Sequence, residues 1–234
     1  MPDLLRAFFL ILMAPLLIGA AAAAQQPAPK AQPQQPQAAM AVDEWGDNFD
    51  GEALDTTKWE RFSFEGGGGG KLKVESGELR MRGMSGSRSG VRSKVEFTGD
   101  RFIFEATLAK VGAALAEPGD KGAPLGNAIL ALMFDGSGRN RIEWVLTSEG
   151  TFEAWSVIDG RGERLDNRNL ATKTPKPTLA IVRRGDDFLF ILNGQVGLTK
   201  TIKNMPRGFH VMLYGFSSSE NNWDSVRVVT PKTQ

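Results

Sequence analysis

Glu143 and Glu149 are the two carboxylates in the stretch RIEWVLTSEG (141–150) whose spacing invites a test for acid–base chemistry. Retaining cleavage of a glycosidic bond uses two carboxyl groups about 5 to 5.5 Å apart, one as nucleophile and one as acid/base. Alternate positions of one strand can provide that separation. Here the four residues after Glu143 carry no carboxylate, and Glu149 follows roughly 20 Å along an extended strand. This strand alone therefore does not supply the pair.

The same stretch predicts a β-hairpin that turns at Glu149 and Gly150. With a two-residue loop, positions placed symmetrically about that dipeptide lie opposite, so Trp144 would face Trp155 on a largely apolar face. The reverse face would carry Arg141 and Glu143 and is more polar. The two tryptophans could be a platform for stacking sugar rings, although paired aromatics among Ile, Val and Leu are typical of a core. Both interpretations stay open.

Polar side chains in other predicted strands suit a carbohydrate ligand. Arg and Glu can make bidentate hydrogen bonds, and Tyr can stack on a sugar face while its hydroxyl stays hydrated. For each of them the alternative is a solvated surface residue. The predicted ligand-binding residues are Arg92, Glu105, Arg141, Glu143 and Tyr214.

Short strands must position these side chains. The chain has 27 glycines, few stretches with helical periodicity and frequent turn signals, such as Asn193-Gly194, which together predict an all-β domain. Thirteen strands are too many for an immunoglobulin-type sandwich. The predicted strands are 57–63, 71–75, 78–83, 89–96, 101–110, 128–135, 140–147, 152–158, 178–184, 187–193, 195–200, 208–216 and 223–230.

The first 24 residues differ from the rest of the chain. After Arg6, a charge-free run from Ala7 to Ala24 ends in small residues, which predicts a secretory signal cleaved near its end. The alternative is an uncleaved anchor, because about 18 apolar residues approach the lower limit for a membrane span. Residues 25–42 are rich in Pro and Gln and predict a flexible linker. We expect one folded domain over residues 43–234.

The amino-acid composition of the chain argues against several classes of partner and catalytic site. The 28 basic and 27 acidic residues nearly cancel, which argues against a partner held mainly by charge, such as nucleic acid or an anionic membrane. The chain has no cysteine, so no disulfide stabilises the expected periplasmic or extracellular product. His210 is the only histidine, which excludes a His-rich zinc site and a Ser-His-Asp triad.

Four stretches, in order, carry a resemblance to a known superfamily. They are WGDNFDGEALDTTKWERF near the start of the domain, VESGELRMRG, PTLAIVRRGDDFLFILNGQVG, and NNWDSVRVV near the end. Together they resemble the concanavalin A-like lectin/glucanase superfamily, whose members include glucanases and laminin-G-like domains. The resemblance spans Asp43 to Val229 and implies an all-β, two-sheet antiparallel jelly-roll sandwich.

The resemblance also bears on activity and ligands. Glucanases of this fold carry E-x-D-x-x-E or E-x-D-x-E on one strand; only Glu143 could begin that motif here, and the other acids are absent. This implies a non-catalytic member that binds ligands on its polar, concave sheet surface. Related jelly rolls often hold a structural Ca²⁺, which implies Asp224 as carboxylate, Gly77 as carbonyl donor and a third carbonyl near Asn48 or Phe49. Alternatively, Asp224 accepts backbone hydrogen bonds at a strand end.

Three functional hypotheses follow. The first is a secreted, lectin-like module that binds a glycan or glycoconjugate, with no nucleic acid partner and no membrane span after signal cleavage. The second is a divergent glycoside hydrolase that uses Glu105 and Glu143 from neighbouring strands, which requires both carboxyls on one face. The third is an envelope or adhesive domain with a protein partner, for which a broad exposed apolar patch would be the sign.

Overall fold

The computed structural model describes residues 42–64, 70–82, 88–112, 126–168, 174–216 and 219–232. The predicted signal segment and, apart from Val42, the predicted linker lie outside these residues. All secondary structure in the described part is β-strand, in two sheets whose neighbouring strands pair antiparallel. Within those residues no helix is present that could cross a membrane. The predicted all-β, two-sheet antiparallel architecture is confirmed.

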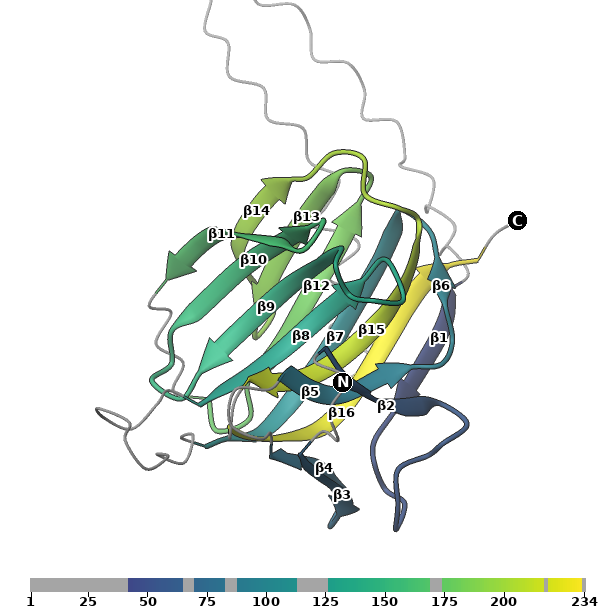
Figure 1. Cartoon of the computed structure of the whole chain (residues 1–234), viewed down its shortest axis with the longest axis vertical. Helices are drawn as coiled ribbons and strands as arrows, with labels where there is room; N and C mark the ends of the chain where they lie inside the picture. The colour runs from purple at the N-terminus through teal and green to yellow at the C-terminus, as the bar shows by residue number, and fades with distance from the viewer. Residues whose placement is uncertain are drawn as a thin grey trace, which may run out of the picture. The chain divides into compact units, whose positions relative to one another are not determined.

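Each sheet has eight strands. Sheet A has the order β14 (Gln195–Thr201), β13 (Asp187–Leu192), β12 (Thr178–Arg184), β7 (Arg101–Val111), β16 (Glu220–Pro231), β4 (Glu78–Arg82) and β3 (Lys71–Glu75), with β1 (Val42–Asp47) paired to β16. Sheet B has the order β11 (Arg161–Arg168), β10 (Phe152–Ile158), β9 (Arg141–Thr147), β8 (Asn127–Met133), β15 (Gly208–Phe216), β5 (Arg88–Ser93) and β2 (Trp59–Ser63), with β6 (Phe97–Thr98) paired to β15. In Figure 1, sheet B faces the viewer and most of sheet A lies behind it.

The core lies between the sheets and follows the two-residue period of the strands. In β7, Phe102, Phe104, Ala106 and Leu108 are buried while the intervening residues point away from sheet B. Trp144 of β9 fills the same layer from sheet B, and its indole N–H donates to the carbonyl of Ile191 in sheet A at 3.1 Å. This alternation leaves one outer face on each sheet free for other contacts.

Three strands were missed by the sequence analysis. β11 is the edge strand of sheet B and carries exposed charged side chains, which suit an edge that must not pair with other chains but hide the apolar pattern of a strand. β1 begins within the predicted linker boundary, and its Trp45 packs on Trp59 with ring centroids 5.1 Å apart. β6 has only two residues. The other predicted strands match observed ones, mostly to within a few residues.

The register of the β9–β10 hairpin corrects the prediction. Thr147 donates its backbone N–H to the carbonyl of Thr151, so the loop has three residues rather than two, with Gly150 at a φ of 79°. Every pair shifts by one position: Trp144 lies opposite Ala154, and Trp155 lies opposite Glu143. The predicted pairing of Trp144 with Trp155 is therefore wrong. Trp144 belongs to the core, and Trp155 lies on the outer face beside Glu143.

The left-handed conformation of Gly150 predicts a local cost of substitution. Gly150→Ala should lower the free energy of unfolding by about 1 to 2 kcal/mol, because a Cβ is strained at positive φ even though this one would meet no atom within 4 Å. Gly136, where a Cβ also meets nothing and φ is not left-handed, is the matched control, and Gly136→Ala should be close to neutral. Urea unfolding of both variants checks this; equal effects would contradict the three-residue loop.

Candidate functional site

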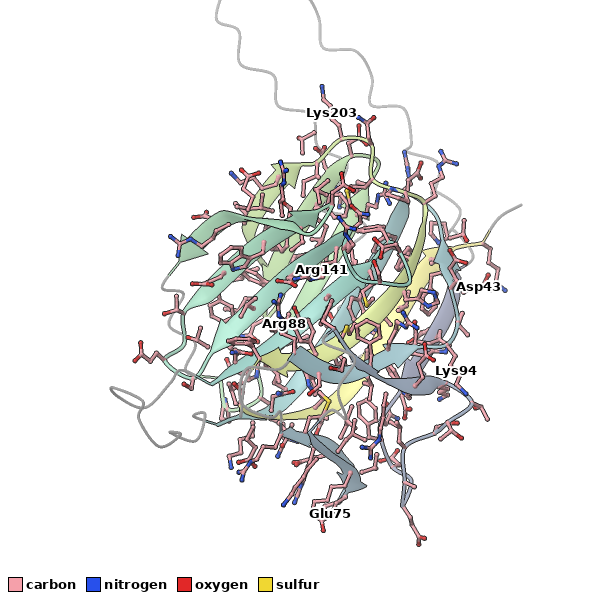
Figure 2. All side chains as sticks on the ribbon, viewed as in Figure 1. Asp43, Glu75, Arg88, Lys94, Arg141 and Lys203 are labelled. Atoms are coloured by element: carbon pink, nitrogen blue, oxygen red, sulfur yellow. The ribbon has the colours of Figure 1, made fainter. Side chains whose placement is uncertain are left out.

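The outer face of sheet B, the side turned away from sheet A, carries a second apolar cluster and a group of charged side chains. The cluster contains Met133, Val145, Met212 and Tyr214, with Trp155 packed against it. Figure 2 shows the charged side chains of Arg88 and Arg141 over the middle of this sheet. Polar groups set in an apolar surface are the usual composition of a binding site.

A buried network connects three of the predicted ligand residues. The guanidinium of Arg141 donates to the carboxylate of Glu143, and the hydroxyl of Tyr214 donates to the same carboxylate oxygen. Burial by itself lowers the pKa of Arg141, but the carboxylate of Glu143 outweighs it and raises that pKa. Burial and the charge of Glu143 raise the pKa of Tyr214 well above its ordinary value. The tyrosine therefore keeps its proton and remains a donor.

Phe64 covers this network. Its ring centroid lies 4.6 Å from the guanidinium carbon of Arg141 and 5.4 Å from the ring centroid of Tyr214. Arg141 and Glu143 are each 6% exposed and Tyr214 is 1% exposed. A sugar cannot reach the ring of Tyr214 in this arrangement, so the predicted stacking role of that residue finds no support. The network instead holds the strands in the middle of this face together beneath the ring of Phe64.

Gly138 allows Phe64 to lie where it does. Its φ is 72°, and a Cβ at this position would lie 2.4 Å from the Cε1 atom of Phe64. The Gly138 carbonyl also accepts a hydrogen bond of 2.7 Å from Arg141. The loop between β8 and β9 thus holds both the charged network and its aromatic cover.

Asp135 holds that loop in shape. Its Oδ1 accepts hydrogen bonds from the backbone N–H and hydroxyl of Ser137, and its Oδ2 accepts from the backbone and side chain of Asn140. Partial burial by itself raises the pKa of Asp135, but these hydrogen bonds outweigh it and lower the pKa to about 2. The loop is therefore fixed by an ionised carboxylate.

Arg92 lies on the same outer face, farther toward the β2 edge. It donates to Glu60 at 2.5 and 2.8 Å and to the carbonyl of Gly136 at 2.9 Å, and its guanidinium carbon lies 4.7 Å from the ring centroid of Phe62. The structure thus brings Arg92 to the face that carries Arg141. Four of the five predicted ligand residues share this face.

Glu105 is the exception. It lies in β7 of sheet A and points outward, where it pairs with Arg227 at 2.8 Å. Because β7 and β9 belong to different sheets and the two glutamates are on opposite outer faces, the hypothesis of a catalytic pair formed by Glu105 and Glu143 is wrong. The strands are both strongly apolar, and only their pairing partners reveal which sheet each one joins.

The outer face is accessible to solvent over β10 and β11. Trp155 is half-buried there, and its indole N–H donates to the carboxylate of Glu153 at 2.9 Å. Arg164 lies opposite Trp155, with a guanidinium nitrogen 3.7 Å from Glu153 and a side chain that is 52% exposed. Gly162 follows on the same side, and its ideal Cβ position lies 3.8 Å from the indole ring. A half-buried tryptophan thus lies beside a loosely paired carboxylate and guanidinium.

The sequence analysis missed Glu153 and Arg164 and left the role of Trp155 open. β11 was not predicted, and the one-residue error in register placed Trp155 on the same face as Trp144. Gly150 at the end of the turn, after Ser148 and Glu149, was the available signal, because a type I turn followed by a left-handed glycine makes a three-residue loop.

The predicted calcium ligands Asp224 and Gly77 lie where β16 meets the start of β4. Trp223 pairs with Leu79, so Asp224 follows at the start of β4, near Gly77. The Asp224 carboxylate accepts a hydrogen bond of 2.5 Å from Lys176, and this contact raises the pKa of Lys176. Among the residues that the structure describes, no three acidic or histidine side chains gather as metal ligands. In this arrangement Asp224 is paired with the exposed ammonium group of Lys176, and the calcium site stays a prediction.

Solved structures with the same fold carry names that refer to glucanases and glycanases. An endo-β-1,3-glucanase from Pyrococcus furiosus superposes with a TM-score of 0.62 at 14% identity, covering 81% of this chain and 94% of that one. A Bacillus licheniformis β-glucanase gives 0.57 at 14% identity, covering 81% and 98%. A structure from work on endo-acting O-glycanases of the human gut microbiota gives 0.62 at 16% identity, covering 80% and 99%.

No protein-family model and no curated protein matches the chain. At these identities the structural likeness shows the fold alone. The chain therefore has the two-sheet jelly-roll fold of these glucanases, as the sequence resemblance implied.

The buried pair Arg141–Glu143 predicts a strong asymmetry between single and double substitutions. Arg141→Met should lower the free energy of unfolding by about 3 to 5 kcal/mol, because it leaves the carboxylate of Glu143 buried without its cation. The double variant Arg141→Met/Glu143→Met should recover more than half of that loss. Urea unfolding measures both, and additive losses would contradict the coupling.

Asp135 predicts acid sensitivity. Since its pKa is lowered on folding, the stability that it contributes is present above the ordinary pKa of 3.8 and is lost as pH falls through about 2. Allowing for solvent screening, the contribution is on the order of 1 to 2 kcal/mol. The stability difference between the wild type and Asp135→Asn, measured by denaturant unfolding, should shrink over this pH window. A constant difference would contradict the prediction.

Proposed function

We propose that this protein is an exported, non-catalytic carbohydrate-binding module in which a sugar ring stacks on Trp155 at the outer face of sheet B. The observation that carries the proposal is the half-buried indole of Trp155 beside the Glu153–Arg164 pair. The export part rests on the predicted signal segment. The carbohydrate part rests on the chemistry of this face and on the names of the glucanases that share the fold.

Trp155 is suited to stacking because its orientation is fixed before a ligand arrives. The hydrogen bond to Glu153 holds the indole in one direction, and the apolar cluster supports one side of the ring. Gly162 places no side chain over the neighbouring surface. A preorganised aromatic surface loses little conformational entropy when a ligand binds, which favours affinity.

The charged neighbours can recognise hydroxyl groups. The exposed guanidinium of Arg164 offers N–H donors, and the neighbouring carboxylate of Glu153 offers acceptor oxygens beside the ring. A sugar presents donors and acceptors around an apolar ring face, so the arrangement matches its chemistry.

Support for a non-catalytic role comes from the position of Glu143. It is the only carboxylate on the outward side of β9, where Arg141, Val145 and Thr147 occupy the other positions. Its carboxylate is engaged by Arg141 and Tyr214 beneath the ring of Phe64. A nucleophile must reach the anomeric carbon, and this oxygen is covered.

A second candidate function is hydrolysis by Glu143 with Glu153. Since Trp155 lies opposite Glu143 and Glu153 lies opposite Val145, the two glutamates are diagonal neighbours on one face. Diagonal Cα atoms lie about 7 to 8 Å apart, a spacing from which carboxyl separations for either glycosidase mechanism can arise. The sequence analysis did not identify this pair, and hydrolysis by it would require Phe64 to move away from Glu143.

Trp155→Ala tests the proposal. Calorimetric titration of the full chain with soluble β-glucans and mucin-type glycans should yield at least one ligand, and the variant should bind it about tenfold more weakly, a change of ~1.4 kcal/mol. Ile158→Ala, on the opposite side of the same strand and 41% exposed, is the matched control and should bind normally. Repeating the titration with chelator tests the calcium prediction.

Two outcomes would overturn the proposal. Release of reducing ends by the wild type, lost in Glu153→Gln, would establish the hydrolase instead. Absence of binding across the panel, with the thermal transition of the protein intact, would remove the carbohydrate assignment altogether.

A further inference from the structure

Two like-charged pairs lie side by side on the edge hairpin of sheet A. In the register of β3 and β4, Lys71 lies directly opposite Arg82, and Lys73 lies directly opposite Arg80. Like charges at opposed positions destabilise a sheet. Successive residues on one face are about 7 Å apart, so four cationic groups occupy a small area. The repulsion between these cations lowers the stability of the sheet, and a bound anion would reduce it.

Carboxylates of the chain compensate only part of this charge. Glu75 pairs with both Lys73 and Arg80, and Glu78 pairs with Arg80. Glu220 pairs with Arg82 and Lys110. Within the described residues, Lys71 forms no ion pair, and Arg61 of the adjacent β2 edge donates only to the backbone carbonyl of Leu72. We call this group the cationic edge patch: Arg61, Lys71, Lys73, Arg80, Arg82 and Lys110, with the three glutamates among them.

A groove runs beneath the patch. A cavity of about 280 Å³ opens between the β2 and β3 edges, and a shallower depression of about 950 Å³ continues over β3, β4 and β16. The smaller volume lies near the lower end of ligand pockets, about 300 Å³. In the larger depression Asn222, only 5% exposed, has a side-chain oxygen without a hydrogen-bond partner. This oxygen only accepts hydrogen bonds, so it can take a donor such as a sugar hydroxyl of the ligand but not its anionic group.

The groove also joins the outer face of sheet B. Its wall includes Phe62 and Gly90, which lie on that face, and the ring of Phe62 contacts the guanidinium of Arg92. A chain molecule that lies across sheet B can therefore pass around the edge onto the cationic edge patch without leaving the protein surface.

We propose that the cationic edge patch binds the carboxylate or sulfate groups of an acidic polysaccharide whose sugar rings engage the outer face of sheet B. The inference rests on the proposed function, and it adds a ligand class to it. Lys71 and Arg61 hold the anionic groups, and the like-charged pairs are relieved when the anion binds. Because the net charge of the whole chain is near zero, the attraction is local and is screened by salt.

Lys71→Glu is the decisive variant. It places a carboxylate opposite Arg82, so it should raise the Tm by about 1 to 3 °C while it weakens binding of polygalacturonate about tenfold at low salt. Lys203→Glu makes the same charge change at the other end of the domain, as the positions of Glu75 and Lys203 in Figure 2 illustrate, and should leave binding unchanged. A lower affinity without a higher Tm would reflect damage to the fold and would overturn the inference.

Three probes separate this inference from the proposed function: polygalacturonate, a neutral β-glucan and duplex DNA, each titrated with Lys71→Glu and Trp155→Ala. Weaker polygalacturonate binding in both variants supports both proposals. Equal binding of polygalacturonate and neutral glucan, lost only in Trp155→Ala, overturns the inference alone. Polygalacturonate binding that depends on Lys71 but not on Trp155 overturns the proposed function and the shared path. DNA bound as tightly as polygalacturonate overturns selectivity for a glycan.

Discussion

Strand alternation is the constraint on which the rest of this structure depends. A side chain changes face whenever the pairing of its strand shifts by one residue. In the β9–β10 hairpin, the third loop residue decides that Trp144 enters the core and that Trp155 meets Glu143 outside. Trp155, the aromatic group that carries the proposed function, thus owes its position to the left-handed conformation of one glycine.

Burial separates the charged residues of the outer face into two kinds. Arg141, Glu143 and Tyr214 satisfy one another below the ring of Phe64, and in that position they order the sheet rather than meet a solute. Glu153 and Arg164 remain within reach of solvent. The same residue types can therefore serve the fold or a ligand. Their exposure to solvent decides which of the two roles is open to them.

The sequence carried much of the fold because most strands alternate clearly or are continuously apolar between turn signals. β7 and β12, for instance, were placed within one residue at each end. The edge strand β11 was missed because its side chains are charged. β1 was missed because its sequence, VDEWGD, has three acidic residues and a glycine and no alternating apolar row. The alternation of residues along a strand does not reveal which sheet the strand joins. For this reason the sequence analysis grouped Glu105 with Glu143. Similarly, no pattern along the chain reveals that Phe64 covers Arg141.

Gly138 also affects how easily the outer face could change in evolution. A single methyl group at this position would push Phe64 aside, since the added carbon would lie 2.4 Å from the ring. Water would then reach a carboxylate that already has a tyrosine and an arginine as neighbours. A single substitution at Gly138 would thus turn a covered, structural carboxylate into an exposed one. New reactivity could then be selected on this face of the domain.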